Sequence, residues 1–332
     1  MTRAVPRVVF TRGGLDESAH RVHVAVANED GELVASAGNA DVVTFPRSSS
    51  KPFQALPLAQ AIPDLPADEL AVACASHAGT DEHLRVVRKL LDRAGIGVDA
   101  LQCGVHMPFD AGAAAALVRA GHAPTPLHHN CSGKHAGMLL TCVTRGLDTT
   151  EYTSAEHPLQ REVRSLHARL GGLPGAESVR VGRDGCSVPA MAVSLRAGAS
   201  LFARLAAPSG AYAEALERVF QAMRSHPLLV AGVGRLDTEL MPRVPGCVSK
   251  MGAEGYFGLA LRETPRGPLG VAIKVEDGAE RARAPVTLAV LRALGVPYDA
   301  DLDSVYPAVL RNFAGLEVGS VRADVALRFH GM

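Results

Sequence analysis

Strand-like sequence lies near both ends of this chain, and helix-like sequence fills the middle. Residues 21–36 predict a hairpin, because valines alternate along its first half and Asp30-Gly31 supplies a turn. Further strands are predicted at 256–262, 269–275, 316–321 and 324–329. Helices are predicted at 53–62, 80–93, 111–120, 132–143, 158–170, 189–205, 211–223 and 285–294. This order favours an α+β fold, in which a sheet from both chain ends has a helical segment packed on it.

The size and charge of the chain exclude several classes of protein. It has 332 residues, 47% of them hydrophobic, and no repeat or linker, so we predict a single domain over residues 1–332. Basic and acidic residues number 34 each, which leaves no charge excess for nucleic acid or an anionic membrane. No apolar stretch approaches ~18 residues and the N-terminus lacks the features of a signal peptide, so we expect a cytoplasmic protein.

Lysine is rare in this chain. Only five of the 34 basic residues are lysines, at positions 51, 89, 134, 250 and 274. Arginine keeps its proton in proteins, whereas a desolvated lysine can lose it. Each lysine is therefore a candidate for a role that needs a neutral amine, with an ordinary surface lysine as the alternative. The motifs around Lys51, Lys134 and Lys250 favour the first interpretation.

Ser48 and Lys51 lie three residues apart at a predicted helix start. At helical spacing their side chains share a face. A serine hydroxyl becomes a good nucleophile only when a base takes its proton, and a neutral lysine can be that base. A capped helix with a surface lysine would give the same four-residue pattern.

Two further motifs fit the same chemistry. Ser76 and His77 lie in a predicted turn, where Ser76 can relay a proton or cap a helix, and His77 can bind substrate or be a core histidine. In Lys250-x-Gly252 the glycine lets a substrate approach a strand edge, where Lys250 can meet its carboxylate or assist the proton relay. The order Ser-x-x-Lys, serine motif, Lys-x-Gly is that of serine β-lactamases and penicillin-binding proteins. Because the middle motif differs from theirs, an amidase of the same framework is favoured over a true β-lactamase.

Thiols and imidazoles gather in two parts of the sequence. Cys131, Cys186 and His135, with His128 or His129, offer the donors that zinc prefers. Buried cysteines and surface histidines are the alternative. With six scattered cysteines and no export signal, we expect reduced thiols or metal ligands instead of disulfides. The predicted core cysteines are Cys74, Cys103 and Cys142.

Together these motifs resemble the asparaginase II family, the Rhizobium-type L-asparaginases. The resemblance runs nearly end to end. It rests on Arg12-Gly13-Gly14, Glu17 to His20, Arg47 to Gln54, Ser76-His77-x-Gly79 with His83, Asn130 to His135, Asp184-Gly185-Cys186 with Pro189, and Lys250 to Gly255. It implies a serine β-lactamase-like α+β fold and hydrolysis of L-asparagine to aspartate and ammonia.

The resemblance also implies roles for single residues. Ser48 would be the nucleophile and Lys51 its base, and Ser76 with Lys250 would form a second pair that relays protons. The expected substrate-binding residues are Asp184 for the ammonium, Arg47 for a carboxylate, His77 and Gly252.

A metal and a partner are implied as well. Zinc would bind Cys131, Lys134 and Cys186 close to the active site and tune substrate affinity without making the nucleophile. In this set Lys134 takes the place of His135, which the chemistry of the residues alone suggested as a ligand. His135 stays the alternative ligand. Family members are typically homodimers, so we expect a homodimer whose small-molecule substrate is L-asparagine.

Three alternatives remain open at this stage. The same motifs would serve another serine amidase, acting on glutamine, a β-lactam or a peptide. A zinc-dependent binding protein without turnover would need Ser48 or Lys51 to be lost, and both are present. In a metallohydrolase, zinc-bound water would do the chemistry.

Overall fold

The computed structural model describes residues 5–331 and divides into two compact units. We call them the sheet unit, with residues 5–46, 193–207 and 239–331, and the helical unit, with residues 47–192 and 208–238. Each unit is built from segments that are far apart in the sequence. Whether the two units form the single predicted domain depends on how they associate, so that prediction stays a prediction.

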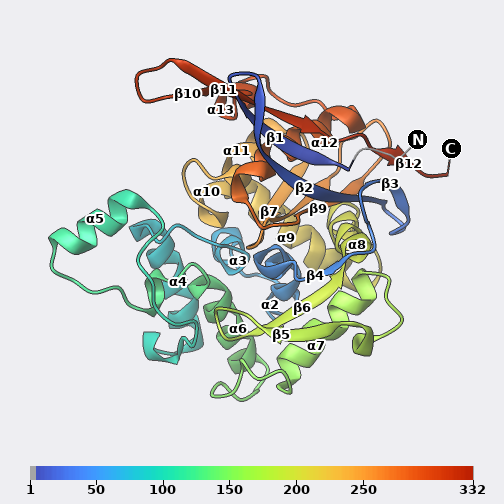
Figure 1. Ribbon diagram of the computed structural model, residues 1–332. Helices are drawn as coiled ribbons and strands as arrows, with labels where there is room; N and C mark the ends of the chain where they lie inside the picture. The colour runs from blue at the N-terminus through green and yellow to red at the C-terminus, as the bar shows by residue number, and fades with distance from the viewer. Residues whose placement is uncertain (1–4, 332) are drawn as a thin grey trace. The chain divides into compact units, whose positions relative to one another are not determined.

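The sheet unit confirms that strands from both chain ends form one sheet. Its strands follow the order β10-β11-β1-β2-β9-β8-β7, with β3 paired to β2 and β12 paired to β3. In Figure 1 the blue strands of the N-terminal part lie beside the orange and red strands of the C-terminal part. The strands are β1 (Arg7–Arg12), β2 (Leu15–Asn28), β3 (Leu33–Ala37), β7 (Cys247–Met251), β8 (Tyr256–Leu261), β9 (Leu269–Val275), β10 (Val309–Arg311), β11 (Glu317–Asp324) and β12 (Arg328–Phe329).

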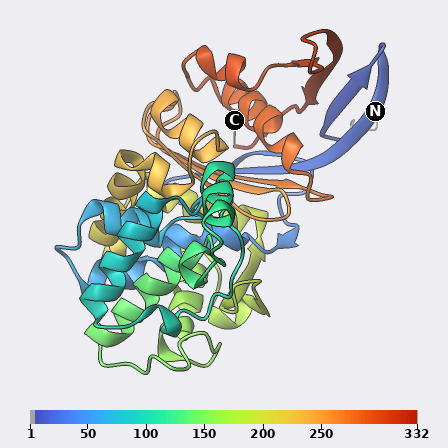
Figure 2. The same cartoon turned by 90° about the vertical axis from the view of Figure 1, so that its left-hand side faces the viewer.

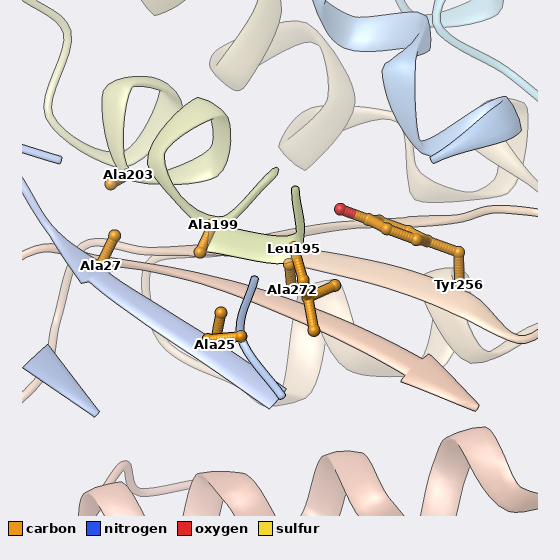
Figure 3. Packing of buried hydrophobic residues seen from close by; sticks show 8 residues of the cluster. Ala25, Ala27, Leu195, Ala199, Ala203, Tyr256 and Ala272 are labelled. Atoms are coloured by element: carbon orange, nitrogen blue, oxygen red, sulfur yellow. The ribbon is translucent and has the colours of Figure 1, made fainter. Parts of the chain in front are cut away.

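Helix α8 (Leu195–Ala206) packs on β2, β8 and β9 through small side chains. Figure 3 shows its alanines Ala199 and Ala203 facing Ala27 and its neighbours on the sheet. A Cβ at Gly270 would lie 2.0 Å from the Ala203 nitrogen, so only glycine allows the helix this close. Helices α12 (Arg283–Leu294) and α13 (Asp301–Val305) also belong to this unit, and α12 contacts β1, β9 and β11.

The predicted helix at 189–205 is wrong in its first part. Residues Pro189–Ser194 form strand β6, and the helix begins only at Leu195. The cause is tertiary, because β6 pairs with β5 (Arg180–Arg183) and, at its end, with β4 (Val43–Thr44). The side chain of Ser194 then caps α8 by accepting a hydrogen bond from the Ala197 amide.

The helical unit contains most of the predicted helices at nearly the predicted bounds. Helices α3, α4 and α6 pack on one another, and Figure 2 shows them among the helices coloured blue to green. Its helices are α1 (Lys51–Gln54), α2 (Leu56–Ala61), α3 (Ala67–Ala73), α4 (Asp81–Ala94), α5 (Ala111–Arg119), α6 (Ser132–Thr144), α7 (Pro158–Leu170), α9 (Ala213–Ser225) and α10 (Pro227–Val230), and α11 (Leu236–Arg243) begins in it.

Local sequence explains where α4 begins and ends. Thr80 and His83 form a reciprocal capping box at its start, and Gly95 ends it in the left-handed conformation at φ 63°. The loop before α4 places Ser76 and His77 between α3 and α4, as predicted. Over residues 5–331, no helix has the length and apolarity that crossing a bilayer requires.

Candidate active site

Ser48 and Lys51 lie where a short 3₁₀ helix, Arg47–Ser50, runs into α1. Pro52 occupies the first turn of α1, where its missing N–H costs nothing. Ser48 is half-buried, whereas the Lys51 side chain is only 1% exposed. The serine is therefore open enough for a substrate, and the lysine is desolvated.

The Lys51 amine contacts a second serine and two backbone carbonyls. It donates to Ala75 O at 2.5 Å and to Asn130 O at 3.4 Å, and it lies 3.0 Å from Ser76 Oγ. Ser48 is not among these partners within the described chain. A neutral amine has two N–H donors and one lone pair, so it can satisfy both carbonyls and still accept the proton of Ser76.

Backbone hydrogen bonds fix the loop that contains Ser76. The Ser76 amide donates to Val230 O at 2.9 Å, and the His77 amide donates to Asn130 O at 3.2 Å. The Asn130 carbonyl is therefore shared between this loop and Lys51. Ser76 itself is 3% exposed, so its hydroxyl is much less open to a substrate than that of Ser48.

His77, a predicted substrate-binding residue, uses both ring nitrogens inside the fold. Its Nδ1 accepts from the Gly79 amide, and its Nε2 lies 2.8 Å from Ser132 Oγ, which donates to Leu127 O. The ring is fully buried and stacks on His83 at 5.1 Å. Burial, with the charges of His83 and Lys51, places the pKa of His77 well below its usual value. These contacts fit the core-histidine alternative, and a role in binding stays a prediction.

Arg47 and Asp184, the other two predicted substrate contacts of this unit, bond to each other. The guanidinium donates to Asp184 Oδ1 through Nε at 3.1 Å and Nη2 at 2.8 Å. Burial alone would raise the pKa of Asp184, but Lys134 and Arg47 lower it below its ordinary value. Arg47 has φ 53°, a left-handed conformation that costs a non-glycine residue about 1 kcal/mol, immediately before Ser48.

Lys134 on α6 lies against the predicted metal-binding cysteines. Its amine donates to Cys186 Sγ at 2.9 Å, and Cys186 is hydrogen-bonded to Cys131. The bond from Cys186 and the charges of Lys51 and Lys134 hold the pKa of Cys131 well below its usual value. Burial would lower the pKa of Lys134, but the two sulfurs raise it. The bond to Cys131 and burial raise the pKa of Cys186, so the two sulfurs are shifted in opposite directions.

His135 presents a ring nitrogen to this cluster. Its Nδ1 lies 2.7 Å from the hydroxyl of Tyr152, while its Nε2 is buried and, among residues 5–331, has only the sulfur of Cys186 nearby to interact with. The ring lies beside Cys186, and burial lowers its pKa to about 4. Two thiols, an amine and an imidazole that stays neutral at physiological pH are donors that suit zinc.

The three-ligand site of Cys131, Cys186 and His135 is not formed in this structure. Across the described residues, no group of three or more His, Cys, Asp and Glu side chains has the spacing to bind a metal ion. A set completed by the Lys134 amine stays a proposal. All six cysteines are buried and none of them forms a disulfide within residues 5–331; Cys247 lies on β7.

Lys250 and Gly252, the remaining predicted residues, belong to the sheet unit. Lys250 lies on β7, the last strand in the sheet order, and its amine donates to Met251 O at 3.0 Å. Gly252 follows the strand and begins the turn to β8, where its amide donates to Tyr256 O. The Lys250-x-Gly252 motif therefore lies at the end of β7. It does not begin β8, the hairpin strand that follows it in the sequence.

Comparison with known proteins identifies the family. A model of the family described as L-asparaginase II matches residues 8–323. The chain belongs to the L-asparaginase II family. Among curated protein sequences there is no match.

Solved structures resemble this L-asparaginase II family member more distantly. Mglu in its native form is 16% identical, with a TM-score of 0.48 over 85% of this chain and 66% of that chain, slightly under two thirds of its length. A Bacillus glutaminase is 12% identical, with a TM-score of 0.41 over 83% of this chain and 91% of that one. A β-lactamase from Mycobacterium bovis is 15% identical, with a TM-score of 0.37 over 82% and 94%. All three TM-scores lie below 0.5, so we take the fold class from the structure itself, which is α+β as predicted.

Family membership supports a hydrolase that cleaves an amide, and the roles of single residues stay predictions. Sequence reasoning missed two parts of the site. The carbonyls of Ala75 and Asn130, which bind the Lys51 amine, are backbone groups and leave no trace in residue type. Tyr152, which orients His135, lies in a loop with no motif of its own.

Proposed function

We propose that this chain hydrolyses L-asparagine to aspartate and ammonia through an acyl-serine intermediate. The supporting observation is a half-buried serine, Ser48, one turn before a fully buried amine, Lys51, in a member of the L-asparaginase II family. The Ser48 oxygen attacks the side-chain amide carbon, the C–N bond breaks, and ammonia leaves. Water then cleaves the ester and releases aspartate.

Lys51 is the proposed acceptor for the serine proton. In the structure its amine donates to Ala75 O, Asn130 O and Ser76 Oγ and also contacts Cys131. In the proposed neutral state two N–H groups would stay on the carbonyls and the lone pair would face Ser76. In this scheme Ser76 passes protons between Lys51 and the leaving nitrogen. Lys250 is proposed as its relay partner on the strength of the family resemblance.

Arg47 and Asp184 are the proposed contacts for the charged groups of a free amino acid. In the structure they neutralise each other. Arg47 directly precedes Ser48 in the sequence, and the ion pair holds Asp184 beside Arg47. A zwitterion brings one carboxylate for Arg47 and one ammonium for Asp184, so it can replace the ion pair without leaving a charge unpaired. A peptide-bonded asparagine lacks both charges, which favours free asparagine as the substrate. Gly252 and His77 remain proposed contacts.

Zinc is the proposed metal, held by Cys131, Lys134 and Cys186, with His135 as the alternative ligand. The buried His135 Nε2 and the two adjacent sulfurs fit a soft N/S site. A bound zinc ion would supply a positive charge that stabilises the thiolates in place of the Lys134 ammonium. Lys134 would then have to lose its proton, because only the neutral amine is a ligand.

A coupled ammonia assay tests the proposed substrate. We expect ammonia from free asparagine at a much higher rate than from glutamine, and Ser48→Ala to abolish it while the far-UV circular dichroism stays unchanged. Ser50→Ala is the matched control, because the Ser50 hydroxyl is buried two residues away and has no hydrogen-bond partner among the residues that the structure describes. Release from glutamine, a β-lactam or a peptide in place of asparagine would identify a different serine amidase, and no turnover of any substrate would favour a zinc-dependent binding protein.

A further inference from the structure

Lys89 on α4 and Lys274 on β9 are the two lysines of this chain that the proposed chemistry does not use, and both are half-buried. Lys89 is the case for comparison, since it forms an ion pair with Asp68 at 2.9 Å. Among the described residues, Lys274 bonds only backbone carbonyls. Its amine donates to Glu254 O at 2.6 Å, to Val275 O and, at 3.5 Å, to Glu276 O.

The three carbonyls come from two turns of the sheet unit. Glu254 lies in the turn that joins β7 to β8, and Val275 and Glu276 lie where β9 ends. The ammonium therefore ties the β7–β8 turn to the end of β9. A second bond, from the Val275 amide to Gly255 O at 3.0 Å, joins the same two segments.

The β7–β8 turn needs this support because its backbone is strained. Glu254 has φ 56° and Gly255 has φ 69°, so two successive residues are left-handed and only one of them is glycine. A left-handed conformation costs a non-glycine residue about 1 kcal/mol. The Lys274 amine stabilises the left-handed conformation of Glu254 because it binds the carbonyl oxygen of that residue.

Lysine is the residue type that fits here. Carboxylates of Glu254, Glu276 and Asp277 act electrostatically on the amine, yet none of them forms an ion pair with it in the described chain. The compact ammonium reaches all three carbonyls through one nitrogen, whereas a guanidinium spreads its donors over a rigid plane, as Arg218 does when it binds three carbonyls through two nitrogens. In a chain that uses arginine at 29 of its 34 basic positions, this explains a lysine at 274.

The turn follows Lys250 and begins with Gly252, two residues of the proposed site. We propose that Lys274 is a positioning residue for amide hydrolysis, whose ammonium fixes the β7–β8 turn and so orients Gly252 and Lys250. The proposal rests on the proposed function of this chain. It differs from a general role in stability, because the effect is confined to one turn.

Three variants test the proposal: Lys274→Met, Lys274→Arg and the control Lys89→Met. We expect kcat/KM for asparagine to fall about 10- to 100-fold in both Lys274 variants, because a small displacement of a site residue has costs of this size. Amide hydrogen exchange over residues 252–256 should become about tenfold faster in them, with other segments unchanged. Lys89→Met should match the wild type in both measurements.

The outcomes separate this proposal from the proposed function. If the wild type releases ammonia from asparagine and Lys274→Arg is equally active, the proposed role of Lys274 is overturned and asparagine hydrolysis stands. Unchanged exchange over 252–256 in an active Lys274→Met protein would do the same. No ammonia from asparagine with the wild type would overturn both. If Lys274→Met fails to fold, Lys274→Arg against the wild type decides.

Discussion

The Lys51 amine lies 3.0 Å from Ser76 Oγ, a serine 25 residues further along the chain, and it bonds the carbonyls of Ala75 and Asn130. The motif that identifies Lys51 pairs it with Ser48, which the structure leaves half-buried and outside this hydrogen-bond set. The two serines therefore differ in what they can do. Ser48 is partly exposed, and Ser76 is hydrogen-bonded to Lys51, the proposed base.

This difference predicts distinct defects for the two serine variants. Ser76→Ala should lower kcat by about 10²- to 10⁴-fold, the usual contribution of a proton-transfer group, while a covalent acyl-enzyme still forms on Ser48. Ser48→Ala should form none. Mass spectrometry of enzyme quenched with asparagine measures the adduct, with Ser50→Ala as the control. An adduct on Ser76 in the wild type would reverse the two assignments.

The thiol cluster predicts a metal effect on affinity. Removing metal with a chelator should raise KM for asparagine and leave kcat within about twofold, because the proposed zinc does not make the nucleophile. Cys186→Ser should weaken zinc binding at least about tenfold by calorimetry, since the ion loses a ligand. Cys142→Ser, a buried cysteine on α6, is the control. Loss of kcat on chelation would instead favour a metallohydrolase.

The sequence predicts elements best where local chemistry decides them. The helix at 158–170 is found at the predicted residues, and the capped helix that Gly95 ends is off by one residue. Strand β6 was mistaken for helix because Pro189 to Ser194 has no local strand signal and is fixed by pairing with β5. Strand β7 was missed because its burial on both faces removes alternation.

The site was predictable to a similar degree. Scarce lysines beside serine and cysteine motifs select the candidate residues, and the structure brings Lys51 to Ser76 and Lys134 to Cys186, while the roles of these residues stay predictions. The Arg47–Asp184 bond was not predictable, because each residue was assigned to a different group of the substrate. Contacts across 137 residues leave no local pattern in a single sequence.

Gly133 in α6 predicts an unusual response to alanine. Glycine inside a helix is normally about 1 kcal/mol worse than alanine, so Gly→Ala should stabilise. Here a Cβ would lie 2.2 Å from Val72 O on α3, so we expect Gly133→Ala to destabilise the fold by at least about 2 kcal/mol, in the range of overpacked cores. Urea denaturation measures this. Gly112→Ala on the exposed helix α5 is the control and should destabilise far less, because its Cβ would meet only the Asp110 side chain, at 3.2 Å. A neutral Gly133→Ala would show that α3 and α6 are less closely packed.

The buried ring of His167 predicts loss of stability in mild acid. Its Nδ1 donates to Val163 O at 2.8 Å, while its Nε2 is buried and finds no partner in the described part of the chain. Protonation would place a charge and an unpaired donor in the core, and this burial lowers the pKa of His167 to about 4 from the ordinary 6.5. The unfolded chain therefore binds more protons between these values, and the contribution is complete above pH 6.5 and lost as pH falls toward 4.

A pKa of about 4 in place of 6.5 corresponds to roughly 3 kcal/mol in the free energy of unfolding. We expect His167→Leu to reduce the loss of stability between pH 7 and pH 4 by that amount, measured by urea denaturation at each pH. Other buried histidines, among them His77 and His135, respond in the same direction, so the variant should flatten the profile without abolishing it. His122→Leu, at an exposed position, should follow the wild-type profile. Identical slopes for the wild type and His167→Leu would mean that water or a local opening solvates the His167 ring.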